Sequence, residues 1–206
     1  MLTLYIAPNT IAVAAAIALN EAGLEHKIAP VDFKAKAQQT PEYLAINPKG
    51  RVPALETPEG ILTEVGAVLD YIAAQAPGAG LVPDDPFQAG RMREVMYYLA
   101  STMHVNHAHK MRGARWADQT SSFEDMRAKV PETMAASCAY LESVAGFDPF
   151  VLGERFTLAD PYVYAIATWL EGDAVDPSAF PKLAAHRAMM AERPSVAAVH
   201  AAGMLG

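Results

Sequence analysis

Two hydrophobic patterns divide the chain. In its first part, short alternating or β-branched segments at residues 2–6, 26–31, 52–56 and 60–63 are separated by turns or by helical segments. Alternation with a period of two is typical of strands, whereas a period near 3.6 is typical of helices. The resulting order, β-α-β-α-β-β-α, predicts a mixed sheet with helices packed on it.

The helical segments of this first part differ in character. Residues 11–22 are nearly all apolar and rich in alanine, which predicts a buried helix that ends at Gly23. Residues 43–46 predict a short helical turn. Another helix is expected to open at Thr63-Glu64 and to run to about Ala74.

Only helical patterns follow the linker at residues 75–86, which is rich in proline and glycine. Asp85-Pro86 predicts the start of a long helix, because it combines a capping side chain with proline at the first position. The apolar stripe of this helix predicts core or subunit-interface residues: Phe87, Met92, Val95, Met96, Leu99 and Met103.

Further helices are predicted in the rest of the chain. Ser122 is expected to cap a second long helix over residues 123–144, and the last two helices are expected at 181–192 and 195–202. Between them, Thr157 and Asp160 fit a capping box, which is a structural feature rather than a catalytic one. The predicted domains are residues 1–78 and 86–206.

Composition and charge narrow the function. The chain has 206 residues and a net charge of −7, which argues against general binding to nucleic acid or to an anionic membrane. Cys138 is its only cysteine, so an intrachain disulfide and a cysteine zinc site are excluded. The apolar run at residues 11–19 is too short to span a bilayer, and no secretory signal is evident, so a cytoplasmic location is expected.

The segment at residues 47–55, Asn-Pro-Lys-Gly-Arg-Val-Pro-Ala-Leu, carries the strongest functional signal. The bond before Pro53 is a candidate cis peptide, and the backbone groups of Val52 are then available to pair with an extended ligand. A helix opens shortly afterwards at Thr63-Glu64, and the first N–H groups of a helix attract carboxylates. Together these features predict a clamp for a small peptide with a free carboxylate.

This combination resembles the glutathione transferase superfamily over nearly the whole chain, most closely its bacterial beta class. The quoted segment, the strand at residues 2–5, the helix ending in Glu21-Ala22-Gly23 and the Thr157–Asp160 box carry the likeness. The resemblance implies an α/β thioredoxin-like N-terminal domain that binds glutathione, followed by an all-α C-terminal domain for the substrate and for dimerisation. It also implies a cytoplasmic homodimer that acts as a glutathione transferase on small electrophilic, largely apolar substrates.

The thiol-activating position departs from the beta class. That class has a cysteine after the first strand, whereas this chain has Asn9 and Thr10 there, followed by Ile11. Either Asn9 or Thr10 offers a donor to a thiolate, so both are candidate catalytic residues, and a helix N-cap pair is the alternative. Tyr5 lies too early, inside the first strand. Redox chemistry through an enzyme cysteine is not expected, since Cys138 fits a core position.

The resemblance assigns further residues to glutathione binding. Val52 and Pro53 would hold the peptide backbone, and Glu64 would receive the γ-glutamyl amine. Val65 stands where the family usually has serine or threonine, so only its backbone N–H remains for the carboxylate. Lys36 would reach the glycine carboxylate, or it is an ordinary solvated loop lysine.

The histidine-rich segment at residues 104–112 supplies one more candidate. His104 matches a beta-class histidine that borders glutathione. His104 and His107 share one helical face, but no third ligand lies nearby in sequence, so no metal is expected. Lys110, Arg112 and Arg115 form a basic cluster that either attracts acidic electrophiles or faces solvent.

Two alternatives to a transferase stay open. A protein that binds glutathione or another ligand with little catalysis is suggested by the missing cysteine and by Val65. A glutathione-dependent isomerase or dehalogenase would use the same thiolate, and the sequence separates it poorly from a conjugating enzyme.

Overall fold

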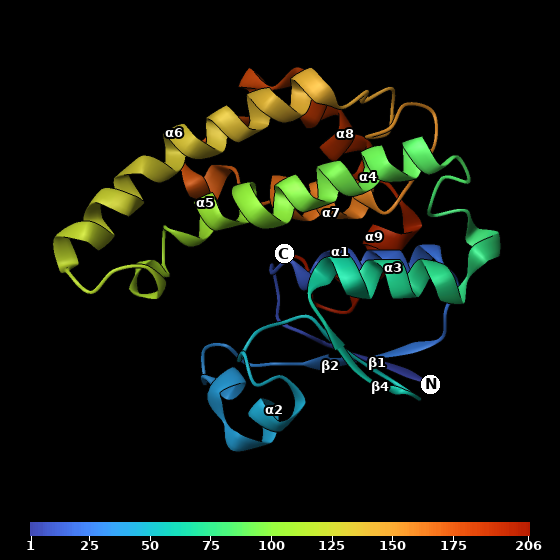
Figure 1. Ribbon diagram of the computed structural model, residues 1–206, viewed down its shortest axis with the longest axis horizontal. Helices are drawn as coiled ribbons and strands as arrows, with labels where there is room; N and C mark the ends of the chain where they lie inside the picture. The colour runs from blue at the N-terminus through green and yellow to red at the C-terminus, as the bar shows by residue number, and fades with distance from the viewer. The chain divides into compact units, whose positions relative to one another are not determined.

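The computed structural model describes residues 1–206, which form two compact units (Figure 1). The first unit comprises residues 1–83 together with 190–206, and the second comprises residues 84–189. The break lies inside the predicted linker. The division differs from the predicted domains at residues 190–206, which join the first unit because the helix α9 (Pro194–Ala201) packs against α1 (Ala12–Glu21).

The first unit is built on a four-stranded mixed sheet in the order β2-β1-β3-β4. β1 (Leu2–Ile6) pairs in parallel with β2 (His26–Pro30) and antiparallel with β3 (Ala54–Thr57). β3 then pairs antiparallel with β4 (Gly60–Thr63) across the predicted hairpin. The sheet confirms the predicted thioredoxin-like arrangement.

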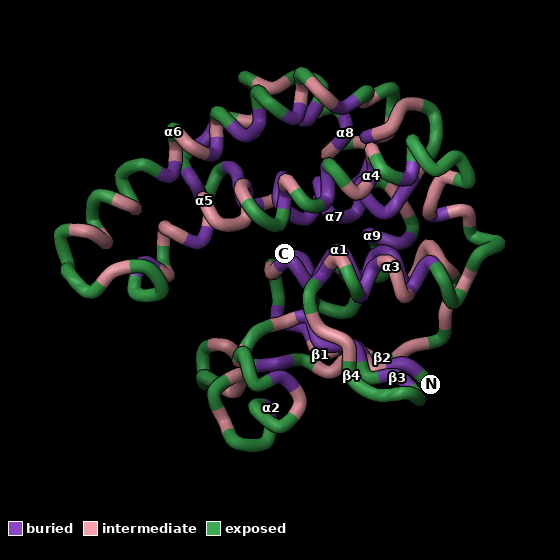
Figure 2. The backbone as a smooth tube through the Cα atoms, in the orientation of Figure 1, coloured by how far each residue is buried: buried purple, intermediate pink, exposed green.

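Helices cover the sheet and thereby remove their apolar faces from water. α1 is buried from Ala12 to Leu19, and its alanines allow close packing against β1, α9 and α3 (Val65–Gln75). Figure 1 shows α1 and α3 on one side of the sheet and α2 (Pro41–Ile46) on the other. Figure 2 shows most of α1 in purple, the colour of buried residues.

Two predicted boundaries in the first unit were wrong by a few residues. β3 begins at Ala54 rather than at Val52, because Pro53 has no N–H to donate to a ladder. α3 begins at Val65, since Glu64 has the non-helical dihedral angles φ 70° and ψ 122° and serves as its N-cap. Both differences fall in the predicted peptide clamp.

The second unit is helical. Its longest elements are α4 (Pro86–Tyr98) and α6 (Thr120–Val144), and α7 (Ala159–Ala167) packs against α4. The shorter elements are the π-helix η3 (Leu99–Met103), α5 (His104–Ala108), η4 (Gly113–Arg115), η5 (Glu171–Asp173), η6 (Pro177–Ala179) and α8 (Pro181–Ala191). The first unit also contains η1 (Ala37–Gln39) and η2 (Pro77–Ala79).

The predicted apolar stripe of the second unit is buried apart from its first residue. Phe87 is 71% exposed, because it lies in the first turn of α4 and burial begins only at Ala89. Ser122 is not a cap either. α6 already begins at Thr120, after the N-cap Gln119, so Ser122 lies in its first turn.

The Thr157–Asp160 pair is structural, as predicted. The buried Asp160 carboxylate accepts hydrogen bonds from the backbone N–H of Thr157 at 2.7 Å and of Val151 at 2.8 Å. His186 Nε2 lies 3.0 Å from the same carboxylate, which ties α8 to the start of α7. The carboxylate thereby satisfies N–H groups that would otherwise be buried without partners.

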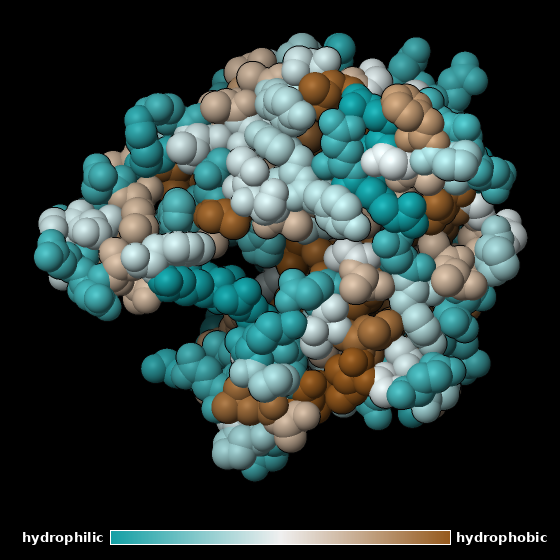
Figure 3. Space-filling model, in the orientation of Figure 1, coloured by the Kyte–Doolittle hydropathy of each residue, from teal (hydrophilic) through white to brown (hydrophobic).

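The surface carries few large hydrophobic side chains. In the view of Figure 3, brown surface covers the region occupied by β4 and α2, which carry the exposed residues Ile61 and Leu44. None of the helices combines the length and the hydrophobicity needed to cross a membrane.

Candidate functional site

The turn before Val52 is fixed by polar contacts to its backbone. Tyr43 Oη and Asn47 Nδ2 each donate to the carbonyl oxygen of Arg51 at 2.7 Å, and Asn47 is buried. Gly50 has φ +60°, and a Cβ there would lie 2.9 Å from the carbonyl oxygen of Gln38, so only glycine fits. The loop therefore presents the next residue, Val52, in a defined position.

Val52 lies just before β3 and has unpaired backbone groups. It precedes a cis bond to Pro53, as predicted, and neither its N–H nor its C=O forms a hydrogen bond within the protein. Its side chain is only partly buried, whereas Pro53 and Ala54 are buried. An extended peptide finds here one donor and one acceptor beside the start of β3.

The second half of the clamp is the start of α3. Glu64 has a positive φ of 70°, and no side chain caps the first N–H groups of the helix, at Val65 and Gly66. A non-glycine residue in this conformation is strained and is found most often at functional sites. These N–H groups and the helix dipole favour an anion at this end of α3.

Lys49 is a residue of this region that the sequence reasoning missed. Its Nζ lies 2.7 Å from Glu64 Oε1 and donates to Thr63 Oγ1 at 2.7 Å. Both partners of the ion pair are substantially exposed, so the pair contributes little to stability and is easily exchanged. The signal was present in the sequence as a lysine in the turn that leads to the clamp.

The turn after β1 holds Asn9 and Thr10 differently from the predicted alternatives. Thr10 Oγ1 donates to the carbonyl oxygen of Ala7 at 2.7 Å, and the N-cap of α1 is Ile11, without a side-chain hydrogen bond. The N-cap alternative was therefore wrong for both residues. No side chain therefore caps α1, and the N–H groups of Val13 and Ala14 donate to the carbonyl oxygens of Thr10 and Ile11 instead.

Asn9 is instead tied to the end of the chain. It adopts φ 57°, a conformation that asparagine tolerates well. Its N–H donates to the carbonyl oxygen of Met204 at 3.0 Å, and its Oδ1 accepts from the N–H of Gly206 at 3.2 Å. These contacts between positions almost 200 residues apart had no signal in the sequence.

Lys36, Tyr5 and Cys138 lie in different surroundings. Lys36 is exposed at the N-cap of η1, and its ammonium group has no ion-pair partner. Tyr5 donates to Glu56 Oε2 at 3.1 Å, and partial burial together with this carboxylate raises the pKa of its hydroxyl. Burial, with a smaller effect of Glu142, raises the pKa of the Cys138 thiol to about 12, so it stays protonated.

His104 lies in the second unit, where it opens α5. Its ring centroid is 5.2 Å from that of Trp169 and 6.5 Å from that of His107. No group of three or more His, Cys, Asp and Glu side chains is arranged to hold a metal ion.

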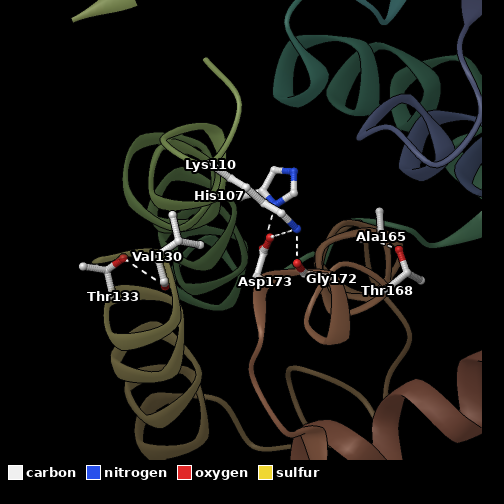
Figure 4. A network of polar contacts seen from close by, with 8 residues as sticks. All are labelled: His107, Lys110, Val130, Thr133, Ala165, Thr168, Gly172 and Asp173. Atoms are coloured by element: carbon white, nitrogen blue, oxygen red, sulfur yellow. Dashed lines mark hydrogen bonds and ion pairs between the residues drawn. The ribbon is translucent and has the colours of Figure 1, made fainter. Parts of the chain in front are cut away.

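His107 forms the centre of a polar network in the same unit (Figure 4). Its Nδ1 lies 2.6 Å from Oδ2 of Asp173, a side chain with no exposed surface, and its ring stacks on Trp169 at 4.2 Å. Lys110 Nζ reaches Asp173 Oδ1 at 3.2 Å and also donates to the carbonyl oxygen of Gly172. Lys110 thus forms an ion pair within the protein. The prediction of a basic cluster that attracts acidic electrophiles or faces solvent did not include this contact.

Both units match known protein families. Residues 1–74 match the family described as "Glutathione S-transferase, N-terminal domain", and residues 99–194 match "Glutathione S-transferase, C-terminal domain". The chain belongs to the glutathione S-transferase family.

Individual members of this family extend the likeness. The crystal structure of a glutathione transferase homologue from Sulfitobacter with bound glutathione is 60% identical, with a TM-score of 0.98, and the match covers 100% of this chain and 99% of that one. A beta-class glutathione S-transferase from Sphingomonas chungbukensis is 29% identical, with a TM-score of 0.83 and coverage of 97% and 98%. Maleylacetoacetate isomerase of Rhizobium meliloti (strain 1021) is 33% identical over 82% of this chain and 81% of the isomerase.

Proposed function

We propose that this protein is a glutathione transferase that activates the thiolate of glutathione for attack on small electrophilic, largely apolar substrates. The observation that carries the proposal is the clamp of the first unit. It combines the unpaired backbone of Val52, the uncapped start of α3 and the Glu64 carboxylate within one short segment. The proposal also rests on membership of the glutathione S-transferase family.

Glutathione fits this clamp group by group. Its cysteinyl backbone would pair with Val52. Its γ-glutamyl carboxylate would accept hydrogen bonds from the N–H groups of Val65 and Gly66. Its α-amino group would bind Glu64 and replace the ammonium group of Lys49. The unpartnered Lys36 remains our candidate for the glycine carboxylate, and His104 for a further contact.

The thiol would be activated at the turn after β1. A thiolate there would gain from the dipole at the N-terminal end of α1 and from one donor, either the hydroxyl of Thr10 or the amide of Asn9. Thr10 must give up its bond to Ala7 to serve, which requires one change of side-chain rotamer.

Calorimetry with glutathione tests the clamp. Glu64→Ala removes the carboxylate that would pair with the amine, so we expect the affinity to fall by about 10- to 100-fold. Glu25→Ala is the matched control, because Glu25 is an exposed carboxylate of the same unit outside the clamp. Equal affinities for wild type and Glu64→Ala would refute the proposed mode of binding.

The ultraviolet absorbance of the thiolate then tests activation. We expect bound glutathione to have a thiol pKa well below that of free glutathione, and Thr10→Val or Asn9→Gly to raise it again. Glycine is chosen for Asn9 because it accepts the positive φ. Tight binding with an unshifted thiol pKa would instead favour a ligand-binding protein, an alternative supported by the hydrogen bond that Thr10 makes to Ala7.

A glutathione-dependent isomerase is the second candidate function. It is favoured by the 33% identity to maleylacetoacetate isomerase, which is similar to the identity with named transferases. An isomerase adds the thiolate to a double bond and later releases it. Turnover that consumes no glutathione would therefore favour the isomerase, and stoichiometric consumption would favour the transferase.

We also propose a homodimer, on the basis of family membership. Light scattering coupled to size-exclusion chromatography measures the mass directly against the 22.1 kDa of one chain. A mass of one chain across the micromolar range would contradict this.

A further inference from the structure

An exposed ion pair lies in the clamp of the first unit. Lys49 Nζ is 2.7 Å from Glu64 Oε1 and donates to Thr63 Oγ1 at 2.7 Å. The side chains of Lys49 and Glu64 are 40% and 67% exposed. An ion pair that is so accessible to water contributes little to the stability of the fold, so both of its charges are available to a ligand.

The backbone holds these two charges beside each other. The N–H of Lys49 donates to Oδ1 of the buried Asn47 at 3.2 Å, in the turn that leads to β3. Thr63 ends β4 and pairs with Ala54 of β3, and Glu64 follows Thr63 directly. The pairing of β3 with β4 therefore brings the turn that carries the lysine next to the start of α3.

Positive groups gather at the residues that begin α3. The N–H groups of Val65 and Gly66 have no side-chain cap, and the ammonium group of Lys49 contacts the two residues immediately before them. In the structure the Glu64 carboxylate balances the lysine. When the ammonium group of a ligand pairs with Glu64, Lys49 loses this partner, whereas its hydrogen bond to Thr63 still holds it at the same end of the helix. A carboxylate on the same ligand restores the balance of charge.

We propose that Lys49 binds the α-carboxylate of the γ-glutamyl group of glutathione and is a specificity-determining residue of the clamp. This deepens the proposed function and rests on it. Glu64 receives the ammonium group and Lys49 the carboxylate of one amino-acid head group, so the two residues exchange their mutual ion pair for two pairs with the ligand. The class of ligand selected is a γ-glutamyl peptide whose amine and carboxylate are both free.

The charges of the clamp then match those of glutathione. The tripeptide carries one ammonium group and two carboxylates, and the clamp offers Glu64, Lys49 and our candidate for the glycine carboxylate, Lys36. Val65 contributes a backbone N–H but no hydroxyl to the γ-glutamyl carboxylate. A lysine on a flexible stem supplies a charged donor in its place, and a hydrogen bond from a charged donor is about twice as strong as one from a neutral group.

Removal of the lysine charge tests the proposal by the sign of the effect. Lys49→Met keeps an unbranched side chain and loses the ammonium group. We expect its affinity for glutathione, measured by calorimetry at low ionic strength, to fall by about 10-fold. A lysine that only occupied Glu64 would compete with the ligand's amine, and its removal would raise the affinity. An affinity that rises or stays unchanged would overturn the proposal.

An analogue of glutathione locates the effect on one group of the ligand. In 4-aminobutanoyl-cysteinylglycine a hydrogen atom replaces the α-carboxylate of the γ-glutamyl group, and the amine is retained. We expect Lys49→Met to bind this analogue no more weakly than wild type does, with weak affinities measured by displacement of glutathione. Equal weakening for glutathione and for the analogue would refute the assignment of Lys49 to the carboxylate.

Two further variants control for net charge and for side-chain packing. Lys27→Met removes the same charge from an exposed lysine of β2, at the opposite edge of the sheet from β4, and should bind glutathione as wild type does. Lys49→Arg keeps the charge and should recover most of the affinity that Lys49→Met loses. A loss of the same size in Lys49→Arg as in Lys49→Met would show that the charge does not bind the ligand.

These titrations require no turnover, so failure of this inference and failure of the proposed function can be told apart. Suppose that glutathione binds with an affinity that depends on Lys49, but keeps the thiol pKa of the free tripeptide. The transferase proposal then fails and the assignment of Lys49 stands. Normal activation of the thiol, with Lys49→Met binding as tightly as wild type, has the reverse meaning. A wild type that does not bind glutathione would refute both.

Discussion

At the scale of single residues, the clamp depends on backbone groups more than on side chains. Val52 offers its N–H and C=O, and Val65 offers only an N–H at the start of α3. Backbone donors tolerate substitution, so the loss of a hydroxyl at position 65 weakens a carboxylate site without abolishing it. The only charged side chain that faces the ligand's amine in our proposal is Glu64.

Val65→Thr should therefore tighten glutathione binding. The substitution adds a hydroxyl beside the N–H that we assign to the γ-glutamyl carboxylate, and one added hydrogen bond corresponds to about 2- to 10-fold in affinity. Calorimetry at constant salt measures the change. Val65→Ala is the control, since it shortens the same buried side chain without adding a donor. Binding no tighter than wild type in Val65→Thr would place the carboxylate elsewhere.

Residue-scale prediction from sequence succeeded where local rules decide. The cis bond before Pro53 and the core position of Cys138 follow from chain chemistry near each residue. The Thr10 hydroxyl was misassigned as a possible cap, because its choice between Ala7 and the helix N–H groups depends on a rotamer. The pairing of His107 with Asp173 depends on the tertiary fold and had no local signal.

At the scale of elements, hydrophobic periodicity predicted the strands and helices of both units to within a few residues. It missed the π-helical turn η3, since one extra residue in a turn barely disturbs a 3.6-residue pattern. It also missed the partner of α9. Packing of α9 on α1 joins segments at opposite ends of the sequence, and periodicity identifies an apolar face without naming what covers it.

A polar contact reinforces this packing. The Glu21 carboxylate accepts from Arg193 at 2.7 and 2.8 Å and from Ser195 at 2.5 Å. Burial acts to raise the pKa of Glu21, but the hydrogen bonds from Arg193 and Ser195 outweigh it, so the pKa is lowered below 4.5. The contact joins the end of α1 to the start of α9.

Glu21→Gln should destabilise the protein in a pH-dependent way. A depressed pKa means that Glu21 contributes stability above its unfolded pKa, which is lost as the pH falls through the folded value. We expect a loss of about 1–2 kcal/mol at neutral pH, from weakened charged hydrogen bonds. The difference from wild type should shrink well below pH 4.5. Urea midpoints at both pH values measure it, and Glu25→Gln is the exposed control. A constant difference would show that Glu21 does not act through its charge.

At the scale of the whole molecule, the two units are not two consecutive stretches of sequence. Residues 190–206 complete the first unit and reach Asn9, at the turn where we place the thiol. A ligand that stabilises the first unit should consequently stabilise the end of the chain as well. Sequence position alone would assign this segment to the helical domain that precedes it.

Hydrogen exchange with and without glutathione distinguishes the two assignments. At a ligand concentration of 100 times Kd, binding stabilises the folded state by about 2.7 kcal/mol, which slows exchange through unfolding of the binding unit by about 100-fold. We expect the slowly exchanging amides of α9 to be slowed together with those of α1 and β1, and more strongly than those of α6. Glu64→Ala at the same glutathione concentration is the control that removes the ligand effect. Slowing of α1 without α9 would contradict the shared unit, because α9 would then open independently of the sheet that α1 covers.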